Sequence, residues 1–437
     1  MKVKNFFADK RRIKKVGIHL AVFAVTLALL WSGLVLSALI PNESIRANFE
    51  KSAEYYMQNE LYPRGKGRLS CSEADNYADG ILLNIAWNMG NGSPLKETLD
   101  TDYHFYPLDQ TKGLYRTVVE GKQPDKDYTR YWHGGAMPVR VLHLFTDVNG
   151  IKLIGLVTAL AGATWTVGML LRRRQFGIAV MFAVSLAAVH VWNIRLSLEY
   201  QTPFIIGLLL CPFCLWLERK GDGFLSILGV IGGTTVAFFD FLTTETVTVL
   251  LPLILVVALR YKEGRLGQVR NAAKLIVKCL LCWGLAYAGV FIVKWVVTSL
   301  VLGENVISLA VHSAAVRIGG ELDNAKRRGI LAPIYANLTA LFYGVEKVEL
   351  ARAFIGLAVI VAVSWFLFFF FGKKLRNSPV PLLAMLGGTV LLRYMVLYNH
   401  SVIHAFFTYR ALVSPLLALL LVFLFKLDFR KRRRSGK

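Results

Sequence analysis

Long apolar runs recur along the chain and are separated by short polar connections. A run of about 20 apolar residues spans the hydrocarbon core of a bilayer as a helix, and these runs lack the alternation typical of membrane-barrel strands. We therefore predict an all-α polytopic membrane protein with about ten transmembrane helices. The expected spans are residues 17–40, 151–171, 176–192, 203–217, 224–239, 246–259, 275–300, 352–372, 379–398 and 411–425.

One long polar segment interrupts this pattern between the first two spans. It predicts an external loop with a candidate active site and interfacial helices: an amphipathic helix over 44–61, a second helix that starts at Ser72, and a third that carries Tyr131 to Phe145. The expected organisation is a basic N-terminus (1–16), the first span (17–40), this loop (41–149), a bundle of about nine spans with an external loop at 301–351 (150–425), and a basic tail (426–437).

The basic residues gather in alternate connections and at both termini. These segments hold 28 of the 51 Lys and Arg but only five of the 28 acids, so they account for the whole net charge of +23. The positive-inside rule places such segments in the cytoplasm. We predict a multi-pass membrane protein with both termini cytoplasmic. This distribution argues against a nucleic-acid-binding protein.

Two acids in the loop are candidate catalytic residues. Asp75 and Asp79 lie one helical turn apart, where two like charges repel. A cation, a divalent metal or a raised pKa would relieve that repulsion. A carboxylate just outside a bilayer can act as a general base on an acceptor hydroxyl. The structural alternative is that Ser72 and Asp75 form a capping box at the start of a helix.

Two basic groups are candidates for binding phosphate. Arg130, His133 and Arg140 would share one face of the expected helix, and all three can donate hydrogen bonds to an anion. The alternative is an interfacial helix whose basic side chains meet lipid headgroups.

The second group lies where the 379–398 span leaves the membrane. His400 and His404 are four residues apart and Arg410 begins the last span, a depth at which ionisable groups are costly unless they are used. Two histidines alone make a poor zinc site. Two Cys-x-x-Cys pairs, at 211–214 and 279–282, are expected to pack as apolar residues rather than to bind metal.

This layout resembles the C superfamily of membrane glycosyltransferases. Those enzymes have a cytoplasmic N-terminus, one span, a large external loop with interfacial helices and a catalytic acid, and then many spans. The stretches Arg130-Tyr131-Trp132-His133-Gly134 and 399–410 also resemble segments of poorly characterised bacterial membrane proteins with that layout. The family's loop acid matches Asp75, with Asp79 as its rival. The family often has two adjacent acids, whereas these two are four residues apart.

The resemblance implies a hexosyl- or pentosyltransferase of the bacterial plasma membrane. Its donor would be a polyprenyl-phosphate-linked sugar that approaches among membrane lipids, and its acceptor an extracytoplasmic glycan, glycolipid or protein. A polymerase or ligase of lipid-linked glycans is a near alternative, although its large loop would be expected late in the chain. A transporter or flippase would need ionisable residues near the midplane, and a non-catalytic scaffold is the third reading.

Overall fold

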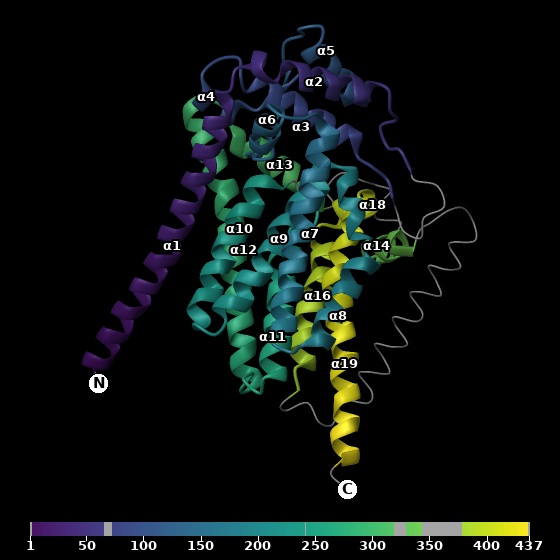
Figure 1. Cartoon of the computed structure of the whole chain (residues 1–437). Helices are drawn as coiled ribbons and strands as arrows, with labels where there is room; N and C mark the ends of the chain where they lie inside the picture. The colour runs from purple at the N-terminus through teal and green to yellow at the C-terminus, as the bar shows by residue number, and fades with distance from the viewer. Residues whose placement is uncertain (1, 65–71, 241, 319–328, 343–377, 436–437) are drawn as a thin grey trace.

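The computed structural model describes residues 2–64, 72–240, 242–318, 329–342 and 378–435. Its eighteen α-helices form a bundle of long helices with a cap of short helices over one end (Figure 1). A single antiparallel pair of two-residue strands, β1 (Asp102–Tyr103) and β2 (Lys126–Asp127), is described in the cap. The expected all-α class is confirmed.

Six helical stretches in the described ranges are long and apolar enough to cross a bilayer. A chain with several such stretches is an integral multi-pass membrane protein. The stretches are residues 13–38 of α1 (Lys2–Ala38), α7 (Val148–Arg172), α9 (Leu198–Leu217), α10 (Asp222–Phe239), α12 (Val269–Leu302), and residues 405–425, which run into α19 (Val413–Ser435).

The other four expected spans do not correspond to any of these six stretches. Those at 176–192, 246–259 and 379–398 are shorter helices, namely α8 (Phe176–Ala188), α11 (Val247–Lys262) and α16 (Val380–Val396). The expected span at 352–372 lies outside the described residues. Of the expected external loop 301–351, the structure describes α13 (Val306–Ile318) and α14 (Ala332–Phe342).

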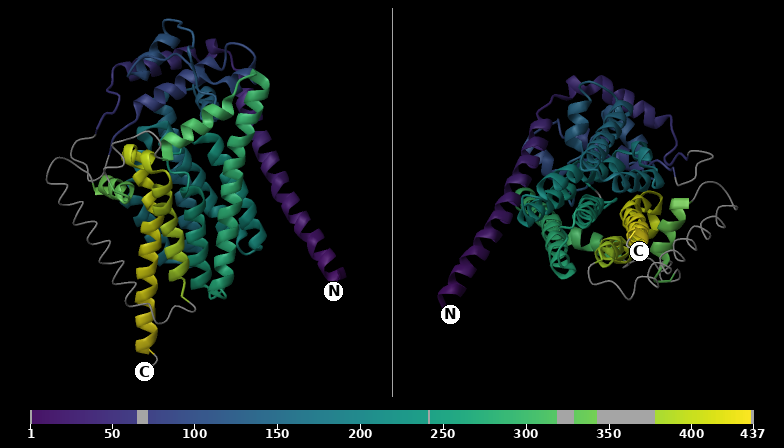
Figure 2. Two further views of the ribbon diagram at one scale, coloured as in Figure 1. Left: turned by 180° about the vertical axis from the view of Figure 1, so that it is seen from behind. Right: turned by 60° about the horizontal axis from the view of Figure 1, so that its bottom comes forward.

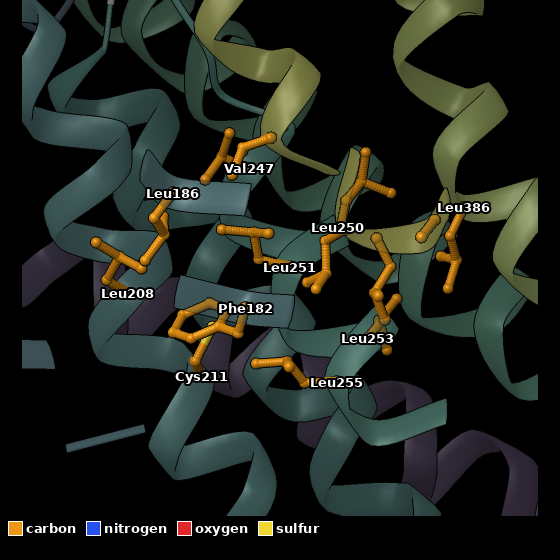
Figure 3. Close-up of a cluster of buried hydrophobic side chains, with 14 of the residues drawn as sticks. Phe182, Leu186, Leu208, Cys211, Val247, Leu250, Leu251, Leu253, Leu255 and Leu386 are labelled. Carbon is orange, nitrogen blue, oxygen red and sulfur yellow. The ribbon is translucent and has the colours of Figure 1, made fainter. Parts of the chain in front are cut away.

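The helix α11 is the core of the bundle. Every residue from Val247 to Leu259 is buried, which is what an apolar helix does when neighbours surround it on all sides. Figure 3 shows its side chains against those of α8, α9 and α16, with Cys211 among them. Cys211, Cys214 and Cys279 are buried free thiols, as expected of packing residues, and no group of three or more His, Cys, Asp or Glu within the described ranges is placed to hold a metal.

The cap comprises α2 (Asn42–Met57), α3 (Asn76–Asn88), α4 (Pro94–Asp100), α5 (Gln110–Val118) and α6 (Ala136–Leu142). The expected amphipathic helix is confirmed as α2, which buries Ile45, Phe49, Ala53 and Tyr56. Its apolar face packs against α3, α5 and the start of α7. Protein therefore covers that face, where the sequence suggested the membrane interface.

Two expected helices begin elsewhere. The helix expected from Ser72 starts at Asn76, and Asp75 is its N-cap: the carboxylate accepts a hydrogen bond of 2.8 Å from the amide of Ala78. The helix expected over 131–145 was also wrong, because α6 has only seven residues.

The cause of the shorter α6 is a close approach at Gly134. Its amide donates to the carbonyl of Phe238 at 3.0 Å, and a Cβ there would lie 2.3 Å from the Phe238 ring. His133 just before it has a left-handed backbone, with φ 51°. Arg130 and His133 therefore precede the helix in a turn and share no helical face with Arg140.

The end of the bundle away from the cap is held by a buried carboxylate. Glu218 accepts from Arg173 at 3.0 Å, from Arg260 at 3.1 Å and from Arg265 at 2.7 Å. The N-terminal end of α1 and the C-terminal end of α19 lie at this same end in every view (Figures 1 and 2). Basic residues thus gather opposite the cap.

The gathering of basic residues at the end opposite the cap predicts the outcome of cysteine labelling. In a chain whose five cysteines are replaced by alanine, Lys122→Cys in the cap should react with an impermeant maleimide on intact cells. Gln268→Cys, exposed between α11 and α12, should react only after permeabilisation, because the positive-inside rule places that end in the cytoplasm. Labelling of Gln268→Cys on intact cells would reverse the orientation.

Candidate functional site

Asp79 joins the cap to the bundle. Its side chain is buried and lies 2.8 Å from the ammonium of Lys152 in α7. It also accepts hydrogen bonds from the Tyr56 hydroxyl (2.7 Å), the Ser197 hydroxyl (2.7 Å) and the amide of Leu198 (2.8 Å). A carboxylate has about four lone-pair positions, and these four donors account for them. Asp79 therefore has no acceptor position left for a substrate hydroxyl.

Asp75, one turn earlier, lines a cavity of about 190 Å³ together with Tyr62, Tyr77, Glu199 and His404. Asp79 also borders this cavity, but its carboxylate oxygens are already bonded within the protein. Burial raises the pKa of Asp75 to about 7; its bond from the Ala78 amide opposes that rise, and the charge of Asp79 adds to it. A carboxyl group with that pKa exchanges protons readily at neutral pH.

Another part of this cavity's wall comes from the C-terminal part of the chain. His400 in α17 (Tyr398–Ile403) and His404 just after it line this cavity, and they also line a neighbouring one of about 270 Å³. The second cavity adds Arg130, from the cap, and His312, from α13. The fold thus brings three of the sequence-predicted residues, Arg130, His400 and His404, to two adjoining cavities beside Asp75.

The side chains of His400 and His404, together called the histidine wall, are held in fixed orientations. His400 Nε2 lies 2.7 Å from the carbonyl of Leu242, and that carbonyl also accepts from Arg393 at 2.6 Å. Arg393 forms a buried ion pair of 2.8 Å with Glu245, which lies just before α11. The imidazole of His404 stacks on the ring of Phe407, with centroids 5.1 Å apart. Packing inside the bundle therefore positions both imidazoles.

Arg130 and His312 add two more potential hydrogen-bond donors to the second cavity. The Arg130 guanidinium lies 4.3 Å from the ring centre of Tyr128, which also lines the Asp75 cavity. His312 was not singled out as a site residue from the sequence. Its external position was the only available signal, because nothing in the sequence places α13 beside α17. An arginine and several imidazoles around one cavity suit an anion such as a phosphate.

The other three predicted phosphate ligands do not line either cavity. His133 is buried beneath Tyr128, whose carbonyl lies 3.0 Å from its Nε2, and burial lowers the pKa of His133 to about 3. It is neutral at physiological pH. Arg140 is also buried and donates to main-chain carbonyls, including that of Ser37 at 2.9 Å, so it fastens the end of α1 to the cap.

Arg410 is buried behind the site. Its guanidinium lies 4.4 Å from the ring centre of Tyr200 and 4.9 Å from that of Tyr409. Within the described ranges its nitrogen atoms have no hydrogen-bond partner. Two aromatic rings thus flank the buried guanidinium of Arg410, which the sequence analysis expected at the membrane surface.

Comparisons with known proteins identify no relative: no protein-family model, no curated protein and no solved structure matches the chain. The case for a function therefore depends on the geometry of the two adjoining cavities.

The contrast between the two acids predicts their effects on stability. Asp79→Asn leaves the Lys152 ammonium buried without its counter-ion, and breaking a buried pair costs roughly 3–5 kcal/mol. Asp75→Asn should change the free energy of unfolding by less than about 1 kcal/mol, since Asn caps a helix about as well as Asp. Unfolding of the purified variants in detergent measures both. The double variant Asp79→Asn/Lys152→Met should recover part of the loss; equal stability of the two single variants would contradict this assignment.

Proposed function

We propose that this chain is a membrane glycosyltransferase that moves a sugar from a polyprenyl-phosphate carrier to an extracytoplasmic glycan, glycolipid or protein. One observation supports it most: Asp75, a buried carboxyl group with a pKa of about 7, faces the same cavity as His400 and His404 at the capped end of an apolar bundle. A base and a set of hydrogen-bond donors for the leaving phosphate are what such a transfer requires. In this proposal the cap faces the outside of the bacterial plasma membrane.

In the proposed transfer, Asp75 accepts a proton and the arginine and histidine side chains bind the leaving phosphate. The acceptor hydroxyl oxygen attacks the anomeric carbon of the sugar, and its proton passes to Asp75. The bond between that carbon and the phosphate oxygen breaks, and polyprenyl phosphate leaves with the electron pair. Negative charge grows on the phosphate in the transition state, where Arg130 and the imidazoles of His404 and His312 stabilise it.

The packing of the bundle favours a transferase over a transporter. Beneath the cavities, the side chains of α8, α9, α11 and α16 form a continuous apolar cluster (Figure 3). A transport path would need polar groups at that depth. The ionisable residues that line the cavities lie instead at the capped end.

Asp75→Asn tests the base. Loss of a general base should lower turnover by roughly 10²–10⁴-fold. The wild-type rate should rise with pH and level off above about 7, because only the deprotonated carboxylate accepts the proton. The assay follows release of polyprenyl phosphate from a panel of carrier-linked hexoses and pentoses, with purified protein in nanodiscs and a glycan acceptor.

Asp109 provides the matched control for this variant. It is also a helix N-cap in the loop, and its carboxylate accepts from the amide of Thr111 at 3.1 Å, but it lines neither cavity. Asp109→Asn should therefore keep wild-type turnover. If Asp75→Asn is as active as Asp109→Asn, Asp75 is not the base.

Arg130→Gln tests the phosphate wall. Removing a charge-assisted hydrogen bond costs about 1.5–3 kcal/mol, so the KM for the carrier-linked donor should rise roughly tenfold or more. Arg116→Gln is the control, because Arg116 also lies over an aromatic ring, 4.7 Å from the centre of Tyr106, but is remote from both cavities. An equal KM in the two variants would remove Arg130 from the donor site.

A further inference from the structure

A third cavity lies on the other side of the segment that carries Asp75. Its volume is about 560 Å³, larger than either cavity described above. Ser72, Ala74 and Asn76 line it, whereas Asp75 and Tyr77 line the first cavity. Successive residues of this short segment thus face opposite spaces, and the third cavity is separate from the proposed transfer site.

The charged side chains that line this cavity are all cationic: Arg64, Lys152 and Arg195. Two of them already have counter-ions, since Arg64 pairs with Glu73 and Lys152 with Asp79. Arg195, at the end of the short 3₁₀ helix η1 (Val191–Leu196), is exposed and makes no hydrogen bond or ion pair within the described ranges. The cavity therefore carries one uncompensated positive charge.

The cavity opens at the outer end of a membrane-spanning helix. Its wall includes Asn149, Lys152 and Leu153 in the first turns of α7. From there Leu153, Val157 and Leu160 follow one face of α7, with 54%, 56% and 38% of their surface exposed. Because α7 is long and apolar enough to cross the bilayer, this face borders lipid chains. Trp192 in η1, 46% exposed, suits the membrane interface.

We propose that the third cavity binds the phosphate group of a membrane lipid whose chain lies along the exposed face of α7. Arg195 would donate to two phosphate oxygens, a geometry for which the planar guanidinium is well suited. The neighbouring Lys152 and Arg64 make the site electropositive while remaining bound to their own acids. This inference does not depend on the transferase proposal, since lipid binding needs no turnover.

Two lipids that differ only in the phosphate test it. The purified full-length chain is titrated by native mass spectrometry with phosphatidic acid and with diacylglycerol that carry the same acyl chains. Phosphatidic acid should bind and diacylglycerol should not. Arg195→Gln should weaken binding of phosphatidic acid about tenfold or more, because a charge-assisted hydrogen bond is lost. Arg195→Lys should weaken it less, and Arg116→Gln should bind as the wild type does.

Further measurements separate a lipid from a free anion. Inorganic phosphate alone should compete only weakly, and Leu153→Ser should weaken phosphatidic acid while leaving binding of inorganic phosphate unchanged. Equal binding of both lipids, or undiminished binding by Arg195→Gln, would overturn the proposal. Inorganic phosphate that binds as tightly as phosphatidic acid would replace the lipid with a free phosphate ligand. Asp75→Asn should bind phosphatidic acid normally, so failure here is independent of any failure of the transfer assay.

Discussion

The buried ion pair between Asp79 and Lys152 fixes the relation between the cap and the bundle. One partner belongs to α3 and the other to α7, and the start of α9 adds a hydroxyl and an amide to the same carboxylate. Burying two charges is costly, and the arrangement is stable only because every lone pair of the carboxylate finds a donor. That requirement allows little variation in the angle at which α3 meets the bundle.

The position of Asp75 follows from that constraint. It lies one helical turn before Asp79, so the contacts that hold Asp79 against the bundle also hold the first turn of α3 at the cavity wall. Its carboxylate caps the helix and is buried beside aromatic side chains, and this burial raises its pKa above that of an exposed aspartate. Asp75 and Asp79 thus lie one turn apart on the same helix but in different surroundings.

The segment at 72–77 separates two cavities at the capped end of the protein. On one side lies Asp75 with the histidine wall, and on the other lies the larger cavity with Arg195. Both spaces lie beside the capped ends of apolar helices. The histidine side depends in turn on the Arg393–Glu245 pair, which holds the Leu242 carbonyl that orients His400.

The local pattern of the sequence determined the features that depend on neighbouring residues. Apolar runs predicted the membrane helices, and the amphipathic period predicted α2, because both arise within one segment. Local spacing also suggested a capping box with Ser72 as the N-cap, and that register is wrong: α3 starts at Asn76, and Asp75 itself is the N-cap.

Tertiary structure decided which polar groups reach a cavity. The spacing of Asp75 and Asp79 does not show which of the two has a structural partner. The fold shows that Asp79 forms an ion pair with Lys152. Spacing also placed Arg140 with Arg130, whereas the close approach of Gly134 to Phe238 lies between them, so α6 begins only at Ala136 and Arg140 is buried inside the cap. His312 joined the site because α13 lies beside α17. Residues so distant in the chain meet through packing between helices, which no local pattern encodes.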